Sequence, residues 1–229
     1  MSGDDQVIKE CAAQSNSRLD LWIRFINANK IKHLVEIGVY KGDFAVKILG
    51  ECESIEKYYM LDPWRHLNDW NKPANKTDDV FDEFLSETIV KTDFAAAKRV
   101  ILRGKTTEVI EEIPDGELDF AYIDGDHTLK GITIDLMRVY PKIRVGGWIG
   151  GDDFSRTIWQ HGLDYDPTFV FPFAIYFAEA LEARIYGLPH GQFLIEKNGN
   201  QSSFSFIDLT GTYNDISLKA ALSLSNKEM

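Results

Sequence analysis

Two patterns of apolar positions alternate along the chain: short continuous runs and longer stretches with helical spacing. The runs typical of buried strands lie at residues 33–39, 57–62, 99–103, 118–124 and 146–151. The amphipathic stretches typical of helices lie at residues 17–30, 42–51, 78–92, 106–112, 128–140 and 169–182. This repeated strand–helix alternation predicts a mostly parallel sheet with helices on both faces.

The end of the chain follows a different pattern. Two short β-rich runs, 184–188 and 192–196, flank a Pro-His-Gly turn and predict a terminal antiparallel hairpin. A further strand at 204–209 and a helix at 215–224 are expected beyond it. The predicted fold is therefore α/β, a Rossmann-like three-layer sandwich with a mostly parallel sheet and a terminal antiparallel hairpin. The 229 residues suit a single domain, divided into an N-terminal helical segment (1–30), a catalytic core (31–197) and a C-terminal extension (198–229).

Composition removes several classes of partner. The formal net charge is −11, so nucleic acid and anionic membrane surfaces are disfavoured. The two cysteines, Cys11 and Cys52, do not support a disulfide framework. The N-terminus has neither the basic start nor the apolar stretch of a signal peptide, which favours a cytoplasmic protein. A small molecule is the expected partner, and association into a homodimer stays open.

The first strand ends in the glycine motif Glu36-Ile-Gly38-Val-Tyr40-Lys-Gly42. Gly38 allows a sharp turn from strand to helix, and Gly42 lets the helix start lie close to a ligand. A dinucleotide fingerprint would need glycine where Tyr40 stands, so NAD binding is disfavoured. The carboxylate of Glu36 suits an amine-bearing or positively charged ligand, although a plain strand–helix turn is the alternative.

Other cofactor-binding candidates follow the second and third strands. Asp62 comes 24 residues after Gly38, close to the spacing at which an acid binds a ribose diol. Trp64 offers an aromatic face for adenine, unless it packs in the core while Asp62 caps the loop. Gly104 and Lys105 follow the third strand at the same edge of the sheet and complete this group.

Acidic residues follow the fourth and fifth strands. Asp124-Gly-Asp126-His127 ends one, and Asp152-Asp153 ends the other. Ends of adjacent parallel strands lie about 5 Å apart, so the carboxylates are expected to crowd together and to need a hard divalent cation, Mg²⁺ or a relative. Asp124, Asp152 and Asp153 are the expected metal ligands. Asp126 and His127 are candidate bases, while a helix cap is the alternative for Asp126.

These motifs together resemble the class I methyltransferases that use S-adenosyl-L-methionine (SAM). The glycine motif matches that family's first motif, and Asp62 matches its ribose-binding acid. The resemblance also implies that Asp124 contacts the cofactor in addition to being a metal ligand. The two acidic strand ends resemble the metal-dependent O-methyltransferases of the macrocin and aminocoumarin sugar type. Catechol-type relatives carry a catalytic lysine where this chain has His127, so the base stays open between Asp126 and His127.

The resemblance implies an activity. A divalent metal would lower the pKa of an acceptor hydroxyl, Asp126 or His127 would take the proton, and the oxygen would attack the methyl group of SAM. The expected acceptor is the hydroxyl of a sugar or of a polyketide or phenolic compound. Its recognition is expected from the variable segments 1–30, 65–80, 155–170 and the C-terminal tail.

Three alternatives stay open at the sequence level. Asp124-Gly-Asp126 is also the Asp-x-Asp pattern of metal-dependent nucleotide-sugar glycosyltransferases, although this explains neither Gly38 nor the Asp152–Asp153 pair. A non-catalytic binding module would keep the fold without turnover. A metal-free methyltransferase would use the acids only to orient the substrate.

Overall fold

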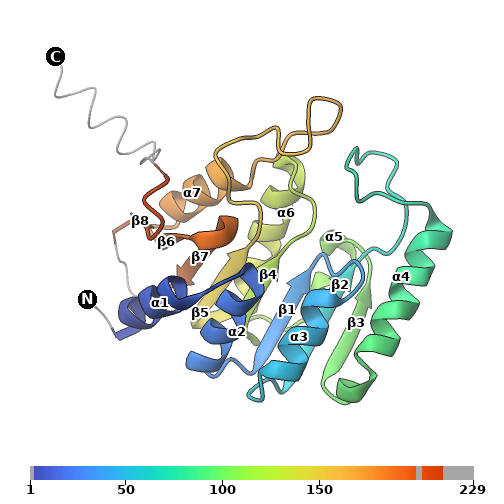
Figure 1. The fold of residues 1–229 in the computed structure, drawn as a ribbon, viewed down its shortest axis with the longest axis horizontal. Coiled ribbons are helices and arrows are strands. Elements are labelled where there is room, and N and C mark those ends of the chain that lie inside the picture. The colour runs from blue at the N-terminus through green and yellow to red at the C-terminus, as the bar shows by residue number, and fades with distance from the viewer. Residues whose placement is uncertain (1–2, 200–202, 214–229) are drawn as a thin grey trace.

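The fold is described from a computed structural model, which places residues 3–199 and 203–213 (Figure 1). The helix predicted at 215–224 lies outside the described residues. Within this part of the chain, one sheet has the strand order β3-β2-β1-β4-β5-β7-β6-β8. The strands are β1 (His33–Ile37), β2 (Lys57–Asp62), β3 (Arg99–Arg103), β4 (Leu118–Ile123), β5 (Ile143–Gly151), β6 (Arg184–Leu188), β7 (Gln192–Lys197) and β8 (Ser205–Asp208).

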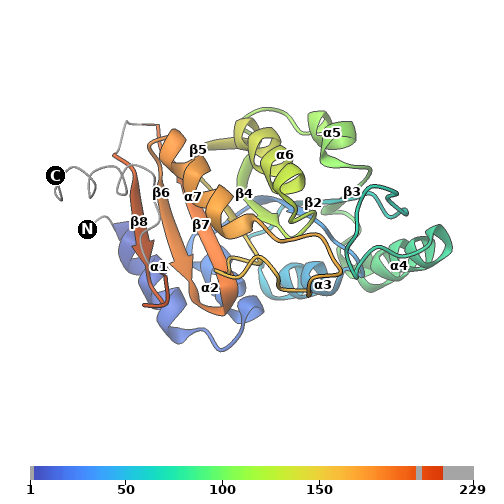
Figure 2. The same ribbon diagram turned by 90° about the horizontal axis from the view of Figure 1, so that it is seen from above.

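Helices cover both faces of the sheet, as the sequence pattern predicts (Figure 2). One face carries α1 (Gly3–Gln14), α2 (Arg18–Ala28), α3 (Asp43–Glu51) and α4 (Asp78–Lys91). The other carries α5 (Thr106–Val109), α6 (Leu129–Val139) and α7 (Val170–Ala180). In the part of the chain that the structure describes, no helix is long and apolar enough to cross a membrane.

Strands β1 to β5 are parallel, and their order determines where a ligand can bind at the edge of the sheet. The chain runs from β1 outward to β2 and β3, then returns to place β4 and β5 on the other side of β1. The gap between the loops that leave β1 and β4 is therefore a topological switch point, where open α/β sheets bind their ligands.

The antiparallel hairpin of β6 and β7 is present, but it does not form the edge of the sheet. Strand β7 pairs antiparallel with both β5 and β6, and β8 then adds to β6 in the parallel direction. The strand expected at 204–209 is thus confirmed. It caps the side of β6 that a terminal hairpin would leave unpaired.

Residues at alternating strand positions belong to two separate hydrophobic cores, one on each face of the sheet. Leu34 and Phe120 belong to the core beneath α1–α4, whereas Val35 and Ile37 belong to the core beneath α6 and α7. Glu36 lies between Val35 and Ile37, so its side chain is on the α1–α4 face. Apolar residues on both faces explain why these strands read as continuous runs in the sequence.

Candidate functional site

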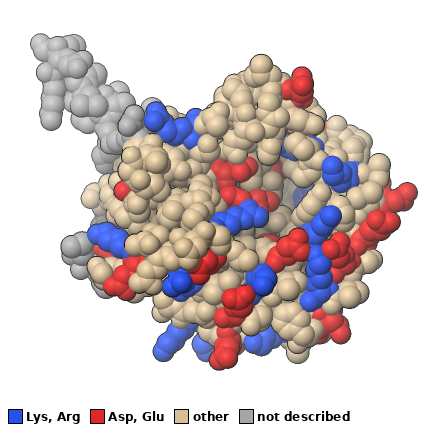
Figure 3. Space-filling model, in the orientation of Figure 1, with Lys and Arg blue, Asp and Glu red and all other residues tan. Residues whose placement is uncertain are grey.

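A cavity of about 540 Å³ opens at the carboxyl ends of β1, β2 and β4, at the switch point of the sheet. It is lined by the loops that follow these strands, by the segment 65–74, by the starts of α5 and α6, and by Arg18 of α2. The space-filling view shows acidic side chains gathered around a hollow on this face, with basic side chains beside it (Figure 3). Its volume lies within the usual range for small-molecule sites.

The glycine turn after β1 requires its two glycines. Gly38 has φ +91°, and a Cβ there would lie 2.2 Å from the backbone oxygen of Asp124. Gly42 has φ +72° and is the N-cap of α3, where a Cβ would lie 2.7 Å from the side chain of Thr88. Tyr40 also has positive φ, at +54°. The close approach of the β1 and β4 loops therefore depends on Gly38.

Asp62 holds this turn in place. One carboxylate oxygen, Oδ2, accepts the backbone N–H groups of Val39 and Tyr40, both at 2.9 Å. The other, Oδ1, accepts the N–H of Trp64 at 2.7 Å. Burial raises the pKa of this carboxyl, against the lowering effect of these three hydrogen bonds. Asp62 lines the cavity, and Oδ1 retains a lone pair for a ligand hydroxyl.

Some of the predicted cofactor residues line the cavity and some do not. Trp64 is fully buried, donates its indole N–H to the carbonyl of Tyr40 at 2.8 Å, and is not a lining residue. This is the core packing that the sequence left as its alternative. Gly42 and Gly104 also lie behind the cavity wall, whereas Tyr40 and Lys105 form part of it.

Glu36 lies at the floor of the cavity and is 1% exposed. The hydroxyl of Tyr58 donates to its Oε2 at 2.7 Å. Burial raises the pKa of Glu36 well above its ordinary value, and the hydrogen bond from Tyr58 opposes this only in part. The sequence predicts a carboxylate here, and the buried setting favours its protonated form more than solvent would.

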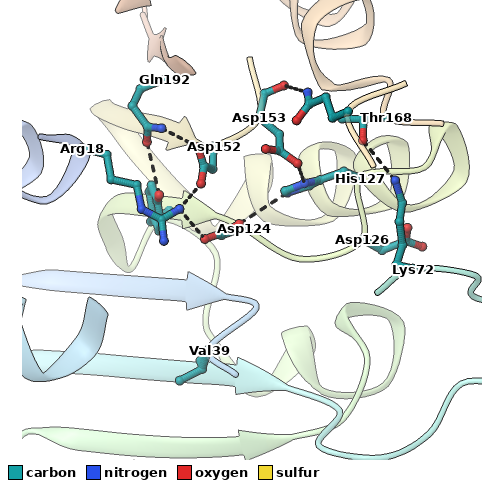
Figure 4. A network of polar contacts seen from close by, with 12 residues as sticks. Arg18, Val39, Lys72, Asp124, Asp126, His127, Asp152, Asp153, Thr168 and Gln192 are labelled. Atoms are coloured by element: carbon teal, nitrogen blue, oxygen red, sulfur yellow. Dashed lines mark hydrogen bonds and ion pairs between the residues drawn. The ribbon is translucent and has the colours of Figure 1, made fainter. Parts of the chain in front are cut away.

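The acidic residues after β4 and β5 do come together, but a cation of the chain lies between two of them (Figure 4). The Nη1 atom of Arg18 lies 3.1 Å from Oδ2 of Asp124 and directly contacts Oδ2 of Asp152. The other oxygen of Asp152, Oδ1, accepts the side-chain amide of Gln192 at 2.5 Å. Burial raises the pKa of Asp124, and the nearby charges of His127 and Arg18 oppose this.

Asp153 is directed toward His127 instead. Its Oδ2 lies 2.5 Å from Nδ1 of His127, and Nε2 of the same ring lies 3.8 Å from Oδ1 of Asp124. Burial alone would lower the pKa of His127, but the hydrogen bond and charge of Asp153 outweigh it and raise the pKa. Nδ1 of this ring is therefore engaged with Asp153.

Asp126 lines the cavity close to the start of α6. Its Oδ1 accepts the backbone N–H of Thr128 at 3.0 Å, and Thr128 in turn caps the helix by accepting the N–H of Gly131 at 3.1 Å. A Cβ on Gly131 would lie 2.2 Å from Cγ of Asp126, so the glycine makes room for this carboxylate. Its Oδ2 remains available to a ligand.

The metal site predicted at Asp124, Asp152 and Asp153 is not confirmed. Across residues 3–199 and 203–213, no group of three or more His, Cys, Asp or Glu side chains is arranged to hold a metal ion. The reason is visible in the contacts: Asp124 and Asp152 share Arg18, and Asp153 is paired with His127. The donor set as it lies here does not fit a divalent cation.

Two functional candidates at this site were missed from the sequence. Arg18 stands at the start of a predicted amphipathic helix, where an exposed arginine is unremarkable. Lys72 lies in a polar loop, yet it is only 6% exposed, and its Nζ donates to Oγ1 of Thr168 at 3.0 Å. Burial lowers the pKa of Lys72, against the charges of Asp153 and Asp126. No local sequence pattern distinguishes either residue.

Two loops close over the acidic end of the cavity. Asn71, in the loop after β2, donates its backbone N–H to Oδ2 of Asp166 at 2.9 Å and accepts the N–H of Asp166 at 3.0 Å. Trp70 lines the cavity beside it, and its indole Nε1 is buried with no hydrogen-bond partner among the described residues. A buried donor without a partner indicates a place for an acceptor group of a ligand.

Comparison with known proteins gives a family match and a set of similar folds. Residues 35–154 match the family described as a methyltransferase domain. No curated protein is a significant match to the chain. Similar folds include a putative caffeoyl-CoA O-methyltransferase from Staphylococcus aureus, with 14% identity, TM-score 0.57 and coverage of 86% of this chain and 93% of that one.

Two further similar structures contain the demethylated cofactor. An O-methyltransferase from Bacillus cereus, in complex with S-adenosylhomocysteine (SAH), is 15% identical with TM-score 0.56, covering 85% of this chain and 90% of that one. The SAH-bound methyltransferase PaMTH1 of Podospora anserina is 14% identical with TM-score 0.54, covering 86% and 89%. At these identities the likeness is one of fold.

Proposed function

Because this chain belongs to the methyltransferase domain family, we propose that it is a SAM-dependent O-methyltransferase acting on a hydroxyl group of a small molecule. The observation that carries the proposal is the single cavity that joins the glycine turn after β1 to the acidic ends of β4 and β5. A cofactor held at the first region and an acceptor held at the second would meet at the switch point of the sheet.

The cofactor end has the groups that SAM requires. Gly38 lets the backbone turn tightly, and the free lone pair on Oδ1 of Asp62 can accept a ribose hydroxyl. Lys105 and Thr106 also line this cavity. The acids around Asp124 provide the negative surroundings that favour a sulfonium cation. The SAH reported for the similar structures supports this ligand.

At the acceptor end, Asp126 is the group best placed to take a proton. Asp126 lines the cavity and uses Oδ1 for the backbone N–H of Thr128, whereas Nδ1 of His127 is engaged with Asp153. Asp126 would accept the hydroxyl proton while the acceptor oxygen forms a bond to the methyl carbon and the carbon–sulfur bond of SAM breaks. The products are the methyl ether and SAH, and the proton passes from Asp126 to solvent.

Mg²⁺ dependence, which the resemblance implies, is not part of the proposed mechanism. The Asp124–Asp152 position already holds the guanidinium of Arg18, so the residues do not fit the ion as they lie. The proposed methyl transfer therefore uses only side chains of the protein and no metal ion. It corresponds to the metal-free methyltransferase that the sequence leaves open as an alternative. The methyltransferase family match disfavours glycosyl transfer. Asp126, the second acid of the Asp-x-Asp pattern, instead accepts a backbone N–H at the start of α6.

The acceptor class is tested with methyl-labelled SAM and a panel of sugars, phenols, catechols and amines, in buffer with EDTA. We expect label in an ether product from at least one hydroxyl compound, and less product from Asp126→Asn. Asp115 is an exposed acid that pairs with Lys142 and does not line the cavity, so Asp115→Asn is the matched control and is expected to keep full turnover. Label found only in amine products would overturn the O-methyl assignment. SAM binding without transfer to any acceptor would favour the binding-module alternative.

A further inference from the structure

We propose that Arg18 is a built-in cation that replaces the divalent metal ion between the ends of β4 and β5, and that its remaining guanidinium N–H groups bind an oxygen of the methyl acceptor. The first part stands on the contacts of Arg18 alone. The second part rests on the proposed methyl transfer. The acceptor that this site would take carries a carboxylate, or two neighbouring oxygens, beside the hydroxyl that is methylated.

The position of the guanidinium carries the inference. A single nitrogen, Nη1, contacts Asp124 and Asp152, which come from the ends of two neighbouring parallel strands. This is the place where the sequence predicts a cation because the two carboxylates would otherwise repel each other. Figure 4 shows the guanidinium between the two carboxylates, reaching in from α2.

Arg18 is held there by a rigid support. Ser17 is the N-cap of helix α2, and its side chain accepts the N–H of Asp20. One turn after Arg18 the side chain of Trp22 is fully buried. The indole of Trp22 donates to Gln192 at 2.7 Å, and Gln192 donates to Asp152 at 2.5 Å. Helix α2 and Asp152 are therefore joined by a second path through Gln192, which fixes their spacing.

Trp22 can lie this close to the sheet only because of Gly150. A Cβ at that position would come within 2.4 Å of Cη2 of Trp22. The glycine in β5 thus sets the depth at which α2 packs, and with it the reach of Arg18.

The three carboxylates already have partners within the chain. Arg18 contacts oxygens of Asp124 and Asp152, and Asp153 is paired with His127. A divalent ion at this position would meet the guanidinium within a few ångströms. It could enter only if Arg18 left the contact.

The unused part of the guanidinium is available to a ligand. The side chain of Arg18 is 45% exposed and lines the cavity, and its hydrogen bonds to other described residues use Nη1 only. Nε and Nη2 carry the other donors of the planar group, so they can form a paired contact with a carboxylate or two neighbouring oxygens. A metal ion at this position would bind these oxygens of the acceptor. In this protein the guanidinium binds them instead.

The test measures Mn²⁺ binding by electron paramagnetic resonance, using the whole protein after treatment with EDTA. We expect wild type to bind no Mn²⁺ at this position. Arg18→Ala and Arg18→Met, which remove the charge, should bind Mn²⁺ more tightly by on the order of a hundredfold, from the Coulomb cost of a unit charge beside the ion. Asp152→Asn added to either variant should abolish that gain.

Matched variants separate the charge from the fold. Arg18→Lys keeps the positive charge and should still exclude Mn²⁺. Arg24→Ala removes an arginine of the same helix that pairs with Asp20, and should behave as wild type. The proposal is overturned if wild type binds Mn²⁺ as tightly as Arg18→Ala and loses it with Asp152→Asn. It is also overturned if both neutral variants, folded by circular dichroism, bind none.

The acceptor-binding part has its own readout. With any acceptor found by the methyl-labelled assay, Arg18→Ala should raise KM more than it lowers kcat, and the increase should be larger for acceptors with a carboxylate or a second oxygen than for those without. An equal effect on both groups would overturn that part. Failure of wild type to bind SAM would defeat the proposed function but would leave the Mn²⁺ result unaffected.

Discussion

The imidazole of His127 and the carboxylate of Asp153 form a partly buried pair, with 2.5 Å between Nδ1 and Oδ2. They follow neighbouring strands, β4 and β5, and the sequence separates them by 26 residues. The pairing engages Nδ1 of His127, and this is why Asp126 is the proposed base.

The first prediction concerns the titration of this pair. The pKa of His127 is raised, so the folding stability it contributes is fully present below about pH 6.5 and is lost as the pH rises through the raised pKa. Asp153→Asn should lower the pKa of His127, followed by NMR of the ring protons. Asp69→Asn, an exposed acid, serves as the control and should leave the titration unchanged. An unaltered pKa in Asp153→Asn would show that the pair does not carry the shift.

The second prediction concerns Gly38. In Gly38→Ala the new Cβ would lie 2.2 Å from the backbone oxygen of Asp124, so the loops after β1 and β4 would have to separate. Gly116→Ala is a matched control, because Gly116 also has positive φ (+72°) but no atom within 4 Å of the added Cβ. The control should lose about 1–2 kcal/mol from its left-handed backbone alone. Gly38→Ala should lose more, and should bind SAM less tightly, as measured by urea unfolding and calorimetry.

The third prediction concerns Asp62. Asp62→Ala leaves the backbone N–H groups of Val39, Tyr40 and Trp64 without their acceptor. A loss on the order of 3 kcal/mol in the free energy of unfolding is expected, together with loss of SAM binding. Asp82→Ala, which removes an exposed partner of Arg103, should cost less than about 1 kcal/mol. Equal losses in the two variants would contradict the role given to Asp62.

Much of the fold followed from local sequence patterns. The strands at 57–62 and 99–103 have the predicted bounds, because each is a short apolar run between polar segments. The meeting of Asp124 with Asp152 was also predictable, since it needs only that the fourth and fifth strands are parallel neighbours. Both inferences use a periodicity or a strand order that the sequence itself carries.

The contacts that were missed depend on packing between distant segments. Arg18 and Asp152 are 134 residues apart, and they meet because Trp22 packs against Gly150. Lys72 becomes buried because the loop after β2 joins the loop before α7 through Asn71 and Asp166. Nothing in the neighbourhood of either basic residue indicates these contacts. For the same reason, Trp64 offered a ligand face in sequence but lies in the core.

The fourth prediction concerns Asp135, a buried acid on α6. Burial raises its pKa to about 7, although Thr106 donates a hydrogen bond to it at 2.5 Å. The folded state then binds a proton that the unfolded state has released, so stability falls as the pH rises from about 4 to 7. Asp135→Asn stays neutral and still accepts from Thr106.

The measurement for Asp135 is chemical unfolding at pH 5 and pH 8. Compared with wild type, Asp135→Asn should gain on the order of 4 kcal/mol at pH 8, since the folded pKa is about 7 and the unfolded value about 3.9, and only about 1.5 kcal/mol at pH 5. Asp115→Asn removes an exposed acid paired with Lys142, and it should show no such pH dependence. A gain that is equal at both pH values would contradict the raised pKa.

The central claim is that the cavity at the ends of β1, β2 and β4 binds SAM without the help of a metal ion. Calorimetric titration of the EDTA-treated protein with SAM, repeated with Mg²⁺ added, tests it most directly. The account predicts binding in the micromolar range with the same affinity and heat in both buffers. No binding in either buffer would contradict the methyltransferase assignment, and binding only with Mg²⁺ would contradict the role of Arg18 as the cation of the site.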